Sequence, residues 1–89
     1  MSRRKREYWD KHRKLGLRIA YFRKLKGLSQ EQFAEKLGYS RQYIGAIEAA
    51  NVKKAVGLDF LFRISEVFGV KEDWFFAEID TLETEKEDK

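Results

Sequence analysis

Two adjacent polar side chains near the middle of the chain have the chemistry to recognise DNA bases. Arg41 and Gln42 follow Ser40 directly. An arginine can donate two hydrogen bonds to O6 and N7 of guanine, and a glutamine can pair its amide with N6 and N7 of adenine. Both reach base edges only from an element narrow enough to enter the major groove, such as a helix. For Arg41 and Gln42 to contact bases, the sequence around them must therefore form such a helix.

The preceding stretch SQEQFAEKLG, residues 29–38, predicts a short helix. Ser29 and Gln32 have the capping-box spacing, in which hydroxyl and amide satisfy backbone donors that a helix start leaves free. Gly38 is suited to end this helix, because glycine readily takes the left-handed conformation found after a last turn. The apolar face is predicted to be Phe33, Ala34 and Leu37.

A second helix is predicted to begin directly after the Gly-Tyr-Ser turn. Ser40 can cap it, and its inward face would be Ile44 and Ile47. Two helices joined by a turn of about three residues form a helix-turn-helix unit, whose second helix enters the major groove. The outward side chains of that helix would then be Arg41, Gln42, Gly45 and Ala46.

Helical apolar spacing recurs on both sides of this unit, and strand alternation is sustained nowhere. Residues 15–25 predict a first helix, which Gly27 ends after a basic last turn. Residues 57–69 predict a fourth helix, and residues 72–76 a short fifth one that begins with two acidic side chains. We therefore predict an all-α fold, a compact bundle of five helices with the helix-turn-helix at helices two and three.

The composition changes at both ends of the predicted helix-turn-helix domain, residues 15–79. Residues 1–14 are crowded with charge and form either a basic arm that lies along DNA or a backward extension of helix one. Residues 80–89 are acidic and too polar to bury, so we expect a disordered tail. The candidate arm residues are Arg3, Arg4, Lys5 and Arg6.

The net charge of +4 is unevenly distributed. Residues 1–54 carry 15 Lys and Arg against 5 Asp and Glu, whereas residues 55–89 carry 4 against 10. A basic half is typical of a protein that binds a polyanion, although a solubilising charge pattern is an alternative.

Other functional classes find little support in the residue types. There is no cysteine, and His12 is the single histidine. No phosphate loop, metal-ligand cluster or nucleophile with a base partner is recognisable, so we expect no metal, no cofactor and no enzymatic activity. No apolar run approaches the roughly 20 residues of a membrane span, and no signal peptide is recognisable, so we expect a cytoplasmic protein without a membrane partner.

Two stretches carry a family resemblance, GLRIAYFRKLKGLSQEQFAEKLGYSRQYIGAIE and LDFLFRISEVFGVKEDWFF, within residues 16–76. They resemble the phage-repressor and Cro family of helix-turn-helix DNA-binding domains, also called the Xre type. The two stretches cover roughly two thirds of the chain. The resemblance implies a lambda-repressor-like fold and binding to double-stranded DNA.

The same resemblance assigns site residues by position. Arg41 and Gln42 fall at base-contacting positions, with Tyr43 beside them touching the DNA backbone or a thymine methyl, and Gly45 and Ala46 further along the same helix. Arg23 and Glu48 match an ion pair that ties helix one to helix three. The expected contacts to the DNA backbone are Gln30, Ser40, Asn51, Lys53 and Lys54.

The sequence also departs from the family pattern. Gly45 and Ala46 stand where many relatives have long polar side chains, so specificity would depend on Arg41, Gln42 and DNA shape. Gly45 also suggests a close approach of its backbone to DNA or to a neighbouring helix. Helix three lacks a terminal glycine, and we expect Asn51, taking a left-handed conformation, to let it continue past Glu48.

These observations predict a sequence-specific regulator of transcription, a repressor that binds a pseudo-palindromic operator as a homodimer. The exposed aromatic surface for dimer contact is predicted at Trp74, Phe75 and Phe76, since apolar patches often mark interfaces. The alternative is an antitoxin or anti-regulator module that acts mainly through a protein partner, for which the same aromatic surface would serve.

Overall fold

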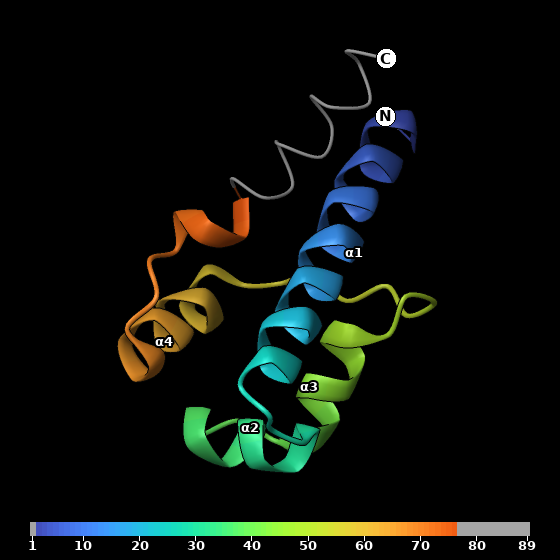
Figure 1. The fold of residues 1–89 in the computed structure, drawn as a ribbon. Coiled ribbons are helices and arrows are strands. Elements are labelled where there is room, and N and C mark those ends of the chain that lie inside the picture. Colours follow the sequence, from blue (N-terminus) through green and yellow to red (C-terminus); the bar gives the residue numbers. More distant parts are fainter. Residues whose placement is uncertain (1, 77–89) are drawn as a thin grey trace.

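The computed structural model in Figure 1 describes residues 2–76, with side chains from residue 8 onward. Its helices are α1 (Ser2–Leu25), α2 (Gln30–Leu37), α3 (Arg41–Glu48) and α4 (Leu58–Phe68). Residues 73–76 form a further helical turn at the end of the described part. The predicted all-α architecture with five helices is confirmed. The predicted acidic tail, residues 80–89, lies outside the described residues.

The first helix is longer than its apolar pattern alone predicts. It begins at Ser2, well before Leu15, and spans 24 residues. The backbone of the basic segment is thus helical, which is the helix-extension alternative, and its Arg, Lys and Glu residues are good helix formers. The side chains of Arg3, Arg4, Lys5 and Arg6 lie outside the described residues.

The helix-turn-helix is capped as the sequence predicts. Ser29 Oγ accepts a hydrogen bond from the Gln32 backbone N–H at 3.1 Å, and the Ser29 N–H donates to Gln32 Oε1 at 2.9 Å. Gly38 follows α2 with φ of 78°, a left-handed conformation that glycine adopts without strain. Ser40 Oγ then accepts from the Tyr43 N–H at 3.0 Å. Short-range hydrogen bonds therefore set both ends of the turn.

The expectation that α3 continues past Glu48 is wrong. Ala49 already has extended backbone angles, φ −79° and ψ 120°, after its N–H donates to Gly45 O. No non-glycine residue of the described part has positive φ, so Asn51 does not take the left-handed conformation. The helix ends without a left-handed residue, because Ala49 is extended and a turn follows in which the Val52 N–H donates to Ala49 O at 3.3 Å. The chain then runs back across α1 towards α4, as Figure 1 shows.

A single core lies between α1, the helix-turn-helix and α4. Phe33, Phe60 and Phe75 are among its largest fully buried side chains. The burial of Phe75 corrects the predicted dimer surface, because a ring packed edge-on against Phe22 and Trp74 cannot contact a second molecule. Trp74 is half-buried and Phe76 is 41% exposed, so that surface is reduced to these two rings.

Candidate nucleic-acid interface

The α3 helix separates into a buried and an exposed side. Ile44 and Ile47 are buried in the core, as predicted. Arg41 and Gln42, in the first turn, are exposed next to each other, and Gly45 and Ala46 are partly exposed one turn further along. The structure thus brings the predicted base-contacting residues together on one helix, with the two small residues one turn after the two long side chains.

Tyr43 has a packing role that the sequence did not reveal. Its ring stacks on Tyr39 with centroids 4.8 Å apart and meets Phe60 edge-on at 5.1 Å. Burial, and secondarily the neighbouring Tyr39, raises the pKa of the Tyr43 phenol, while a backbone hydrogen bond at Gly57 acts in the opposite direction. The ring therefore braces α3 against the start of α4, and only part of it remains available for DNA.

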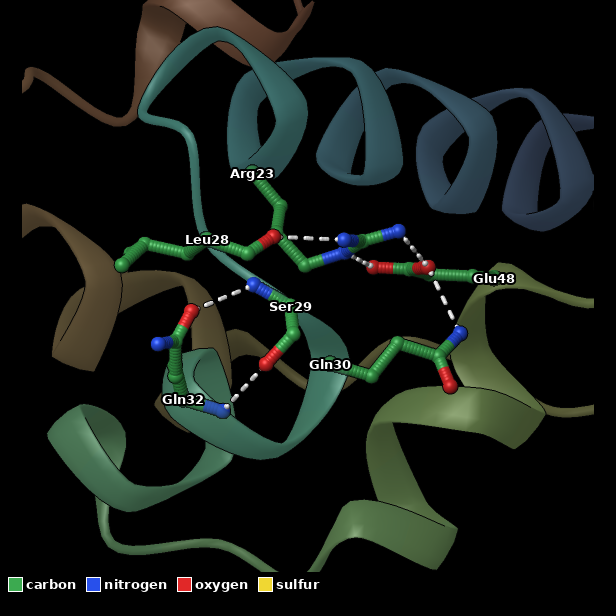
Figure 2. A network of polar contacts seen from close by, with 6 residues as sticks. All are labelled: Arg23, Leu28, Ser29, Gln30, Gln32 and Glu48. Atoms are coloured by element: carbon green, nitrogen blue, oxygen red, sulfur yellow. Dashed lines mark hydrogen bonds and ion pairs between the residues drawn. The ribbon is translucent and has the colours of Figure 1, made fainter.

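A polar network holds the opposite end of α3, as Figure 2 shows. Arg23 forms two hydrogen bonds with the Glu48 carboxylate, from Nε to Oε2 at 2.8 Å and from Nη2 to Oε1 at 3.0 Å. Its remaining terminal nitrogen, Nη1, donates to Leu28 O at 2.6 Å. The predicted Arg23–Glu48 pair is present, and it connects α1, the turn before α2 and the last residue of α3.

The same carboxylate orients a side chain of α2. Gln30 Nε2 donates to Glu48 Oε1 at 3.0 Å, as the dashed line in Figure 2 shows. Because a carboxylate only accepts, this bond fixes which side of the amide carries nitrogen. Nε2 carries a second hydrogen, which this bond does not use and which can be donated to a phosphate oxygen. Gln30, expected at the DNA backbone, is thus positioned from α3.

The glycine of α3 meets no tight neighbour within the chain. A Cβ placed on Gly45 would have Gln30 Oε1 as its neighbour at 3.7 Å, an ordinary van der Waals distance. The expected close approach of a neighbouring helix to Gly45 is therefore not found in the described part.

The close approach occurs instead at Gly16, which sequence reasoning missed. A Cβ at Gly16 would lie 2.1 Å from Ile47 O, a distance that no side chain tolerates. The backbones of α1 and α3 therefore cross here in direct contact. A glycine inside a basic, helical stretch was the available signal, because glycine in a helix interior costs about 1 kcal/mol relative to alanine.

The loop that follows α3 carries the other expected DNA contacts. Asn51, Lys53 and Lys54 are all exposed. The Lys54 ammonium lies 5.1 Å from the centre of the Tyr43 ring, which places this lysine beside α3. The loop returns to the core at Val56, whose N–H donates to His12 Nδ1 at 3.0 Å. The loop thus joins α3 to the middle of α1.

Residues 8–76 hold no group of three or more His, Cys, Asp or Glu side chains placed to bind a metal ion. In the same described part, no helix combines the length and the apolar character that crossing a membrane requires.

A family model described as helix-turn-helix matches residues 19–75. The chain belongs to this family. The match spans α2, the turn and α3, together with the Arg23–Glu48 pair that secures them. It confirms the resemblance to phage-repressor and Cro-like domains.

Named relatives agree with this membership. The helix-turn-helix chain is 47% identical over 64 residues to an uncharacterized HTH-type transcriptional regulator of Methanocaldococcus jannaschii, covering 71% of this chain and 94% of the relative. It is 35% identical over 69 residues to the HTH-type transcriptional regulator SinR of Bacillus licheniformis, covering 78% of this chain. It spans 61% of that SinR and 50% of the SinR of Bacillus subtilis, to which it is 38% identical.

The range of the family match separates the predicted DNA contacts from the basic segment of α1. All predicted contacts to bases and DNA backbone, from Gln30 to Lys54, lie within residues 19–75 of this helix-turn-helix chain. The first two thirds of α1 precede the match, including the basic segment 2–14.

Proposed function

We propose that the chain is a sequence-specific regulator of transcription, a repressor, that binds double-stranded DNA with α3 in the major groove. The observation that carries this proposal is the exposure of Arg41 and Gln42 on the first turn of a helix whose other side is buried and ion-paired. Relatives named as HTH-type transcriptional regulators support it.

The proposed recognition divides the work between two kinds of contact. Arg41 pairs with a guanine and Gln42 with an adenine, because their donors and acceptors match those base edges. Gln30 and the loop lysines hold phosphates on either side, with Ser40, Asn51 and the free edge of Tyr43 contributing close to the backbone. Gly45 and Ala46 add little hydrogen bonding, so the shape of the DNA contributes to specificity.

We further propose that the regulator binds as a homodimer. Two copies would place their α3 helices about 34 Å apart, one helical turn of DNA, so the operator would be an imperfect palindrome. Trp74 and Phe76 are the proposed contact, since both rings remain partly exposed at the end of the described chain. Analytical ultracentrifugation of the full chain and of Phe76→Ser tests this: the variant should shift towards monomer.

In vitro selection from a random duplex library, at about 150 mM salt, tests the DNA-binding proposal. We expect enrichment of a two-fold motif, with Arg41→Ala and Gln42→Ala each relaxing the preference at one base position. Lys71→Ala removes an exposed charge that lies after α4, away from α2 and α3 in the sequence. This variant is the matched control and should select the same motif. A library that stays random with the wild-type chain would contradict base recognition by α3.

The second candidate is an antitoxin or anti-regulator module. It is favoured by exposed apolar side chains on the face of α1 opposite to its buried residues: Leu17, Tyr21 and Leu25, at successive steps of four. This candidate predicts stoichiometric co-purification with one protein from the native cell. A duplex library that stays random after selection, together with isolation of such a complex, would favour this function over sequence-specific DNA binding.

A further inference from the structure

The N-terminal half of α1 and the loop after α3 enclose a groove of which the proposed function uses only the two loop lysines. Its volume is about 210 Å³. Trp9, Asp10 and Arg13 of α1 form one wall, and residues 52–54 of the loop form the other. Ile47 of α3 forms the apolar floor together with Ala49 and Ala50, which follow the helix. Figure 1 shows α1 continuing well past α3, which is what creates this wall.

The groove has a predominantly positive rim. Arg13, Lys53 and Lys54 line it, against the single carboxylate of Asp10. The Arg13 Nη2 lies 3.7 Å from Asp10 Oδ1, and both side chains are about half exposed. An exposed pair at this distance contributes little stability, so the Arg13 guanidinium can turn to another anion at low cost. Its planar fork suits a phosphate.

The groove is continuous with α3. Lys54 lines the groove, and its ammonium lies 5.1 Å from the centre of the Tyr43 ring. Tyr43 is the residue that follows Gln42 in α3. An extended polyanion lying on the base-contacting turn of α3 can therefore pass along the loop to Arg13. The three cations of the groove are all exposed, which favours a strand of phosphates over an enclosed small anion.

We propose that this groove binds the sugar–phosphate backbone of DNA flanking the base pairs contacted by α3, with Arg13 as a phosphate contact supplied from outside the family match. The inference rests on the proposed DNA binding and extends it. The long α1 thereby widens the footprint of the helix-turn-helix, and the apolar floor packs against deoxyribose. Arg13 contributes affinity without base preference, because phosphate contacts carry no sequence information directly.

The test measures operator affinity against salt concentration for the full chain, using the motif obtained by selection. Each neutralised phosphate adds about 0.9 to the magnitude of the slope of log K against log salt. Arg13→Ala should lower this slope by about that amount and weaken binding at low salt, with the preferred sequence unchanged. Arg13→Lys should retain the slope. Lys11→Ala is the matched control, because this exposed cation of α1 does not line the groove.

Hydroxyl-radical footprinting provides a second measurement. Wild-type protein should protect sugars beyond the selected motif on the side of the groove, and Arg13→Ala should lose that flanking protection. An Arg13→Ala slope equal to that of wild type and Lys11→Ala, with unchanged flanking protection, would overturn this inference while leaving DNA binding intact. Failure of the wild-type chain to bind any duplex would overturn both.

Discussion

The α3 helix and the loop that leads from it to α4 differ in how firmly the rest of the molecule holds them. The α3 helix touches α1 backbone to backbone at Gly16 and is fastened by the Arg23–Glu48 pair at its last residue. The following loop is exposed from Asn51 to Ala55, and His12 at Val56 is its single side-chain hydrogen bond among those described.

This difference matches the two recognition tasks of the proposed function. Hydrogen bonds to base edges demand side chains held within about half an ångström, which requires a rigid support. Phosphate contacts are less demanding, because a long cationic side chain can adjust to a backbone that runs past it. The rigid part of the molecule therefore carries Arg41 and Gln42, and the more loosely held part carries Lys53 and Lys54.

The largest effect is expected from breaking the support at Glu48. In Glu48→Leu the Arg23 guanidinium stays buried without its carboxylate, so the free energy of unfolding should fall by about 3–5 kcal/mol. Urea denaturation measures this. Arg23→Met combined with Glu48→Leu should recover much of the loss, since no unpaired charge remains. A double variant no more stable than Glu48→Leu would contradict this account.

An exposed ion pair is the matched control. Arg63 Nη1 lies 3.2 Å from Glu66 Oε1 at the surface of α4. Glu66→Gln should change the free energy of unfolding by less than about 1 kcal/mol.

A smaller effect is expected at the helix crossing. Gly16→Ala forces a methyl group against Ile47 O and should destabilise the fold by about 1–3 kcal/mol, although alanine is the better helix former. Gly45→Ala, in a helix interior with room for the methyl group, should instead stabilise it by up to about 1 kcal/mol. Thermal unfolding of both variants gives the comparison, and shifts of the same sign would refute it.

A smaller effect again is expected in the loop. His12→Ala removes the acceptor for the Val56 N–H, and water can replace it in part because the neighbouring loop is exposed, so the cost should be about 1 kcal/mol. Amide hydrogen exchange should quicken at Val56 while Ile44 and Ile47 in α3 keep their protection. Equal acceleration in α3 would show that loop and helix open as one unit.

The smallest expected effect concerns alkaline pH. The pKa of Tyr43 is raised by burial, so the folded chain holds this proton more tightly than the unfolded chain, whose tyrosines titrate near pH 10. Stability should therefore decline as pH rises above about 10. Tyr43→Phe should reduce that decline, as monitored by denaturation at several pH values. The Tyr21→Phe control, at an exposed ring, should leave the decline unchanged.

Local rules account for what the sequence predicted well. Ser29, Gln32 and Gly38 form a cap and a stop through hydrogen bonds to residues three or four positions away, and these bonds are the ones observed. The spacing of Ile44 and Ile47 likewise determines which side of α3 is buried. The Arg23–Glu48 pair was implied by the family resemblance rather than by spacing.

The missed features depend on contacts between distant segments. The crossing at Gly16 involves Ile47, and the local signal, a glycine inside a helix, does not indicate which segment comes close. In the run from Trp74 to Phe76, three adjacent aromatic rings give no periodicity by which to choose the buried one. Tyr43 faces the core only because Tyr39 and Phe60 are placed beside it.

The room for a side chain at Gly45 has a consequence for how the binding preference of the proposed regulator can change. Around this position the surface of α3 is bare backbone with a glutamine amide nearby, and the core lies on the other side of the helix. A longer side chain introduced there would extend from the partly exposed side of α3, next to Gln30, without disturbing a packed ring. In the proposed DNA complex, position 45 is therefore a site at which one substitution can change the preferred operator while the packing of the helices stays the same.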